Sequence, residues 1–109
     1  FLAFSDRVRG LGHFEAAPYG CSRLYDPNRS DYNSACKGNS AVRAMIEKVY
    51  AAFQSKAIAD PMNLHDAPVV VVIGMNDSVV HPPVTKAAVH LYQEFSANLR
   101  VYEVPSGEH

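Results

Sequence analysis

The segment Pro68-Val69-Val70-Val71-Val72-Ile73-Gly74-Met75-Asn76-Asp77-Ser78 decides the fold. Its five consecutive β-branched residues, Val69 to Ile73, favour a strand. Because apolar side chains alternate onto both sides of this strand, the pattern predicts that both of its faces are covered. Such coverage is typical of a central strand in a parallel α/β sheet. The polar turn that begins at Gly74 predicts the end of the strand.

Downstream of this strand, the sequence predicts a helix over 83–97 and a second strand over 99–104. Pro82 and Pro83 suit the first helical turn, where a missing N–H group does no harm. Asn98 is the expected C-terminal stop of the helix. The apolar stripe on the helix consists of Val84, Ala87, Ala88, Leu91 and Phe95. Residues 59–109 are therefore expected to form a strand–helix–strand unit of an α/β fold with a parallel sheet.

Upstream of the strand, a helix is predicted over 41–56, capped by Asn39 or Ser40. It leads through a proline-bracketed loop to the strand. Its apolar stripe at helical spacing is formed by Val42, Met45, Ile46, Val49 and Phe53. Residues 1–39 show no sustained period of 2 or 3.6, so loops with a short helical turn are expected there.

The composition limits the class of protein. The chain has 109 residues, enough for one small domain. Ten Lys and Arg against eleven Asp and Glu give a net charge of −1, so no electrostatic feature favours nucleic acid or an anionic membrane as a partner. The longest aliphatic run, Val69 to Ile73, is far shorter than the roughly 20 residues of a membrane helix. The ends of the sequence suggest a piece of a longer chain.

The two cysteines, Cys21 and Cys36, leave two alternatives open. A disulfide would suit an oxidising compartment, and two free thiols would suit the cytosol. The fourteen residues between them exclude a CxxC redox or zinc-knuckle pattern. The compartment is therefore not predicted.

Two polar residues follow the predicted strands, at the points where the strands end. Asp77 follows the first strand and His109 follows the second. Because the carboxyl ends of neighbouring parallel strands meet at one edge of a sheet, the two side chains are expected to make contact there. A carboxylate beside an imidazole fixes the tautomer of the imidazole and stabilises its protonated form during proton transfer.

In their order along the chain, these elements resemble the last part of an α/β-hydrolase. The resemblance covers about residues 60–109 and is carried by the Pro-led aliphatic strand, the Gly-x-x-Asp turn at Gly74 to Asp77, the helix, and the final strand with its loop to His109. It implies that Asp77 is the acid of a catalytic triad and His109 the base. The branch of monoglyceride lipases, lysophospholipases and serine aminopeptidases is the most similar. Residues 1–58 would then be a cap or lid segment with the helix that leads back to the sheet.

The nucleophile of such an enzyme is not evident in the sequence. The motif G-x-S-x-G is absent, and Gly38-Asn39-Ser40-Ala41-Val42 lacks its second glycine and a preceding strand. Ser40 is therefore interpreted as a helix-cap residue, and the nucleophile is expected upstream in a longer parent chain. The resemblance implies cleavage of carboxylic esters of lipids or small molecules, or of peptide-like amides. Residues 1–109 alone are expected to be inactive.

The expected partners are an ester substrate and the remainder of the parent chain, with no cofactor. No metal is expected, because His65-Asp66 and His81 lack a third ligand at regular spacing. His81 could line the edge of the site. His13 and His90 are expected to be structural or solvated, and Glu103 is expected to be a charge on the last strand at the edge of the sheet. A second hypothesis remains open: a non-catalytic α/β binding or regulatory module in which Asp77 is only a turn residue.

Overall fold

The computed structural model describes residues 1–21 and 32–109, and its centre is a parallel sheet of three strands. The strands are β1 (Leu11–Phe14), β2 (Pro68–Gly74) and β3 (Asn98–Val104), in the spatial order β1-β2-β3. In the register of the sheet, Val71 of β2 pairs with His13 on one side and Val101 on the other. The predicted α/β class and the parallel pairing of the last two strands are confirmed.

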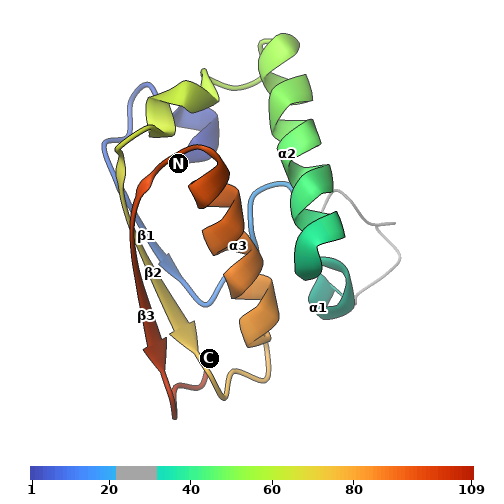
Figure 1. The fold of residues 1–109 in the computed structure, drawn as a ribbon, viewed down its shortest axis with the longest axis vertical. Coiled ribbons are helices and arrows are strands. Elements are labelled where there is room, and N and C mark those ends of the chain that lie inside the picture. Colours follow the sequence, from blue (N-terminus) through green and yellow to red (C-terminus); the bar gives the residue numbers. More distant parts are fainter. Residues whose placement is uncertain (22–31) are drawn as a thin grey trace.

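Helices lie against this sheet in successive layers (Figure 1). Helix α3 (Pro82–Glu94) contacts β2 and β3, and α2 (Gly38–Gln54) packs against α3. The shorter elements are α1 (Tyr32–Ala35) and the 3-10 helices η1 (Leu2–Phe4) and η3 (Pro61–Leu64). None of the helices described is both long and apolar enough to cross a membrane.

Helix α3 agrees closely with its prediction. All five residues of its predicted apolar stripe are buried, and proline occupies its first positions. Its end differs, because Ser96 takes a positive φ of 54° and breaks the helix before Asn98. The prediction of Asn98 as the stop is wrong, since this residue already begins β3.

Helix α2 begins earlier than predicted. The chain enters it at Gly38, whose φ of +82° suits glycine, after Lys37 in an extended conformation. Asn39 and Ser40 therefore lie inside the first turn, and the predicted capping by either of them is wrong. Three residues of the predicted apolar stripe, Val42, Met45 and Val49, are buried, whereas the side chain of Phe53 is 37% exposed.

Strand β1 was not predicted, since residues 1–39 were expected to be loops with a helical turn. The strand has four residues, and only His13 among them is buried, so it has no apolar alternation. The strand forms because its backbone pairs with β2. In this pairing Leu11 lies opposite Val69, which is 58 positions further along the chain. The sheet thus includes part of the segment 1–58, and the assignment of that segment to a cap stays a prediction.

The two faces of β2 are buried unequally. Val69, Val71 and Ile73 are at most 1% exposed and belong to the hydrophobic core. Val70 and Val72 face the other way and are only half-buried. The expectation of a doubly covered strand is wrong for the residues described, because their helices pack on one face. On the open face, Val72 is flanked in register by two exposed aromatic side chains, Phe14 and Tyr102.

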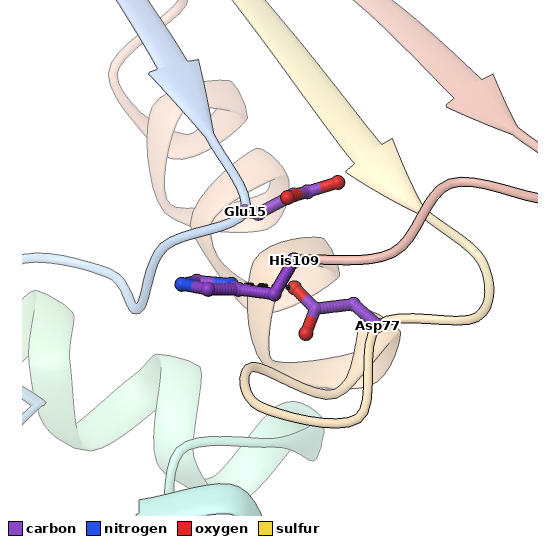
Figure 2. Close-up of side chains that lie close together, drawn as sticks. All are labelled: Glu15, Asp77 and His109. Atoms are coloured by element: carbon purple, nitrogen blue, oxygen red, sulfur yellow. Dashed lines mark hydrogen bonds and ion pairs between the residues drawn. The ribbon is translucent and has the colours of Figure 1, made fainter.

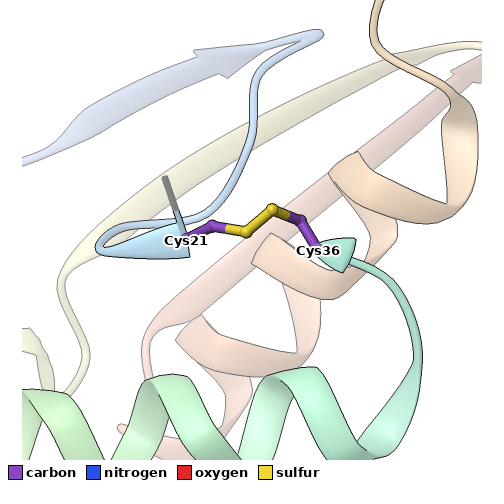
Figure 3. The surroundings of a disulfide bond; sticks show 2 residues. All are labelled: Cys21 and Cys36. Atoms are coloured by element: carbon purple, nitrogen blue, oxygen red, sulfur yellow. A yellow bond between two sulfur atoms is a disulfide. The ribbon is translucent and has the colours of Figure 1, made fainter. Parts of the chain in front are cut away.

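A disulfide joins Cys21 to Cys36 (Figure 3). It links the segment that follows β1 to the residue immediately after α1, and both cysteines are fully buried. Their Cα atoms lie 5.8 Å apart, a normal separation for a disulfide. Of the two alternatives that the sequence leaves open, the structure contains the bonded one.

Candidate active site

Three loops meet at the carboxyl edge of the sheet, and each brings one ionisable side chain (Figure 2). Glu15 follows β1, Asp77 lies in the turn after β2, and His109 lies in the loop after β3. The position of each side chain is set by the point at which the preceding strand ends. The parallel topology therefore assembles this cluster, as expected for Asp77 and His109.

Asp77 and His109 form a hydrogen bond in which Oδ2 of the carboxylate lies 3.0 Å from Nδ1 of the imidazole. The other carboxylate oxygen, Oδ1, accepts hydrogen bonds from the backbone N–H groups of Val79 at 2.8 Å and Val80 at 2.9 Å. The side chain of Asp77 is 1% exposed, whereas that of His109 is 46% exposed. The predicted contact between carboxylate and imidazole is thus confirmed.

The surroundings of Asp77 favour its ionised form. Burial acts to raise the pKa of its carboxyl group, but the hydrogen bonds from His109, Val80 and Val79 act in the opposite direction and prevail. The pKa of Asp77 lies below its ordinary value as a result. A carboxylate can only accept a hydrogen bond, so Nδ1 of His109 is the donor. Nε2 is then the unprotonated nitrogen of the neutral ring and can act as a base.

Direct hydrogen bonds join the loops that carry the two residues. The backbone N–H of Met75 donates to the carbonyl of Val104 at 3.0 Å, and that of Asn76 donates to the carbonyl of Gly107 at 2.9 Å. Within the first loop, the N–H of Asp77 donates to the carbonyl of Gly74 at 3.2 Å. The distance between Asp77 and His109 is therefore set by backbone contacts as well as by their side chains.

Glu15 is the residue of this cluster that the sequence analysis missed. Its N–H donates to the carbonyl of Val72 at 3.2 Å, and its φ is +42°. One ligand atom from each of Glu15, Asp77 and His109 lies within 4.8 Å of the other two, a spacing that could attract a cation. Both oxygens of Asp77 are already hydrogen-bonded, however, and we assign no metal here. No signal in the sequence indicated Glu15, because the strand before it was not recognised.

The other sequence candidates form no hydrogen bond or ion pair with Asp77 or His109 among the described residues. Ser40 is exposed in the first turn of α2, and no hydrogen bond among the described residues joins it to His109. His81 is exposed in the loop before α3, where its backbone N–H donates to Oδ1 of Asn33. His65 and Asp66 form an exposed pair, with 3.0 Å between Nδ1 and Oδ2, before the start of β2. They therefore lie near the opposite edge of the sheet.

His13 is a buried structural histidine, as expected. Its Nε2 lies 2.8 Å from the carbonyl of Ala16, so Nε2–H is the donor and Nδ1 can accept from the Tyr92 hydroxyl at 3.3 Å. Burial lowers the pKa of His13 and raises the pKa of Tyr92 to about 12. His90 is exposed, and Glu103 forms a 2.8 Å ion pair with Lys86.

The parallel sheet and the helices packed against it define an α/β fold. A similar solved structure is that of a PHB depolymerase variant complexed with an R3HB trimer. It matches with a TM-score of 0.74 and 23% sequence identity over 96% of this chain. The chain spans 32% of the length of that structure's chain. No family model matches the sequence. No curated protein matches it either.

Proposed function

We propose that this chain supplies the acid and the base of a serine hydrolase that cleaves carboxylic esters. The observation that carries the proposal is the 3.0 Å hydrogen bond from Nδ1 of His109 to Asp77, made between loops at the carboxyl ends of adjacent parallel strands. This arrangement leaves Nε2 of a half-exposed imidazole free to exchange a proton with a nucleophile.

The proposed reaction is acyl transfer. A serine hydroxyl from the remainder of the parent chain attacks the acyl carbon, and Nε2 of His109 takes the hydroxyl proton. Asp77 stays ionised and stabilises the imidazolium that forms. When the tetrahedral intermediate collapses, the ester C–O bond breaks and His109 returns the proton to the leaving alcohol. Water then attacks the acyl-enzyme while His109 takes its proton, and His109 returns the proton to the serine as the carboxylic acid leaves.

The substrate class rests on two lines of support. The sequence resembles the lipase and lysophospholipase branch at Asp77 and His109, and a similar fold occurs in a PHB depolymerase that binds an R3HB trimer. Both suggest an ester of a carboxylic acid. A substrate panel should therefore contain a p-nitrophenyl ester, a monoacylglycerol and the R3HB trimer, and relative kcat/KM values would identify the branch.

The experiment that tests the proposal is labelling of the parent protein with a fluorophosphonate probe, which reacts only with an activated serine. Labelling is expected for the wild type. Asp77→Asn should reduce kcat by about 10⁴-fold, because it disturbs the imidazole tautomer. His109→Ala should have a comparable or larger effect. His90→Ala, a change at an exposed histidine on α3, is the matched control. It should be labelled by the probe and should keep the wild-type kcat.

The contrary outcomes are equally defined. A folded parent protein that neither labels nor hydrolyses any ester would contradict the proposal and favour the non-catalytic α/β module. Residues 1–109 alone are expected to show no turnover. Turnover by this segment that disappears in Ser40→Ala would make Ser40 the nucleophile.

A further inference from the structure

The side chain of Asn33 bridges α1 to the loop that holds Asp77. Its Oδ1 accepts the backbone N–H of His81 at 2.9 Å, and its Nδ2 donates to the backbone carbonyl of Val79 at 2.9 Å. These contacts join residues 46 and 48 positions apart in the sequence. One amide group thus binds a carbonyl and an N–H on either side of Val80.

The same short loop provides both backbone donors to Asp77. The N–H groups of Val79 and Val80 point to Oδ1 of Asp77, while the carbonyl of Val79 and the N–H of His81 point to Asn33. The loop is therefore held between a carboxylate on one side and an amide on the other. A shift of the loop would move both donors and, with them, the carboxylate.

We propose that Asn33 is a positioning residue that sets the orientation of Asp77 toward His109. This inference rests on the proposed function for its catalytic consequence, but not for its structural one. Asn33 contacts neither member of the pair and acts through residues 79–81.

The support behind Asn33 is firm. Ala35 and Cys36, two and three positions after Asn33, are buried, and Cys36 is bonded covalently to Cys21. Through this disulfide, the amide is tied to the segment that follows β1, the strand on the far side of β2 from β3. The amide of Asn33 and its two hydrogen bonds to residues 79–81 form a clamp, and the disulfide ties this clamp covalently to the segment after β1.

The chemistry of the clamp requires an amide. Alanine at position 33 would leave the carbonyl of Val79 and the N–H of His81 without these partners. Aspartate would keep an acceptor for the N–H of His81, but would place an oxygen against the carbonyl of Val79 and add a negative charge near Asp77. Asn33→Ala therefore removes both hydrogen bonds, and Asn33→Asp removes only the one to Val79.

The test uses the parent protein with two separate measurements. The first is the titration of Asp77, followed by ¹³C NMR at its carboxyl carbon. The other titratable residues near Asp77 are His109 and Glu15 in the cluster and His81 on the same loop. The second is kcat and KM for an ester substrate. Asn33→Ala should raise the titration midpoint of Asp77 toward its ordinary value. It should also lower kcat by about 10²-fold with little change in KM, as for a misplaced catalytic group.

The matched control is Asn63→Ala, an asparagine exposed on η3 at a distance from the site, which should change neither quantity. A folded Asn33→Ala variant with wild-type titration and wild-type kcat would overturn the inference. If Asn33→Ala does not fold, Asn33→Asp decides in its place, and wild-type values for that variant would overturn it. A shifted Asp77 titration in a protein without esterase activity would support the clamp and contradict the proposed function.

Discussion

Gly107 lies so close to Gly74 that a methyl group added to Gly107 would stand 3.0 Å from the Gly74 Cα atom. The converse addition, at Gly74, would stand 2.8 Å from the carbonyl oxygen of Gly107. This close approach allows the N–H of Asn76 to reach that carbonyl, which joins the loop of Asp77 to the loop of His109. The absence of two side chains is thus a condition for the contact between the proposed acid and base.

The first prediction concerns this approach. Gly74→Ala should separate the two loops, because the new methyl group meets the Gly107 carbonyl and the carboxylate of Glu15. We expect a loss of about 1–3 kcal/mol in unfolding free energy and a fall of about 10²-fold in kcat of the parent protein. Chemical denaturation and ester hydrolysis measure the two effects. Gly12→Ala is the control, since the three atoms nearest to its methyl group would all belong to the movable ring of exposed Phe14. Equal effects of both substitutions would contradict the role given to Gly74.

The second prediction concerns acid stability. The folded-state pKa of Asp77 is lowered from its ordinary value of 3.8. The corresponding stabilisation is therefore present above that value and is lost as the pH falls through the folded-state pKa. Asp77→Asn should be less stable than the wild type at neutral pH, and the difference should shrink below pH 3.8. Urea unfolding along a pH series measures it. A constant difference throughout the series would show that ionisation of Asp77 is not the cause.

The third prediction concerns the buried contact of His13 with Tyr92. Burial lowers the pKa of His13 from 6.5, so the unfolded chain takes up a proton there before the folded chain does. Stability should accordingly decrease as the pH falls below 6.5, and this part of the decrease should be missing in His13→Gln. Thermal unfolding between neutral and mildly acidic pH provides the measurement. The exposed His90→Gln variant should keep the wild-type slope, and the prediction fails if the slope of His13→Gln is also unchanged.

The fourth prediction contrasts the two faces of β2. Val71→Ala should lower the free energy of unfolding by about 1.5–3 kcal/mol, since Val71 is fully buried in the core. Val72→Ala removes the same two methyl groups from a half-buried position on the open face and should cost less. Each variant is the other's control in equilibrium unfolding. Equal losses would mean that the open face is covered in solution.

The elements of this fold that the sequence predicts are those with a local pattern in their own residues. The β-branched run from Val69 and the stripe from Val84 to Leu91 determine β2 and α3 through their own spacing, and the parallel order then places Asp77 beside His109. Strand β1 has no such spacing, because its stability comes from pairing with a distant strand. Glu15 and Asn33 escaped notice for the same reason, since their importance comes from contacts across the fold. The single-sided burial of β2 also depends on what packs against it, which a run of valines does not specify.

The disulfide has a consequence for the order of folding events. Pairing of β1 with β2 must close a loop between Leu11 and Val69, and the entropy of that closure opposes the step. Cys21 and Cys36 both lie inside this loop, so their bond bypasses the fourteen residues between them and shortens the loop that must close. Oxidation should therefore speed the arrival of β1 at the sheet, the step that delivers Glu15 to the edge where Asp77 and His109 meet.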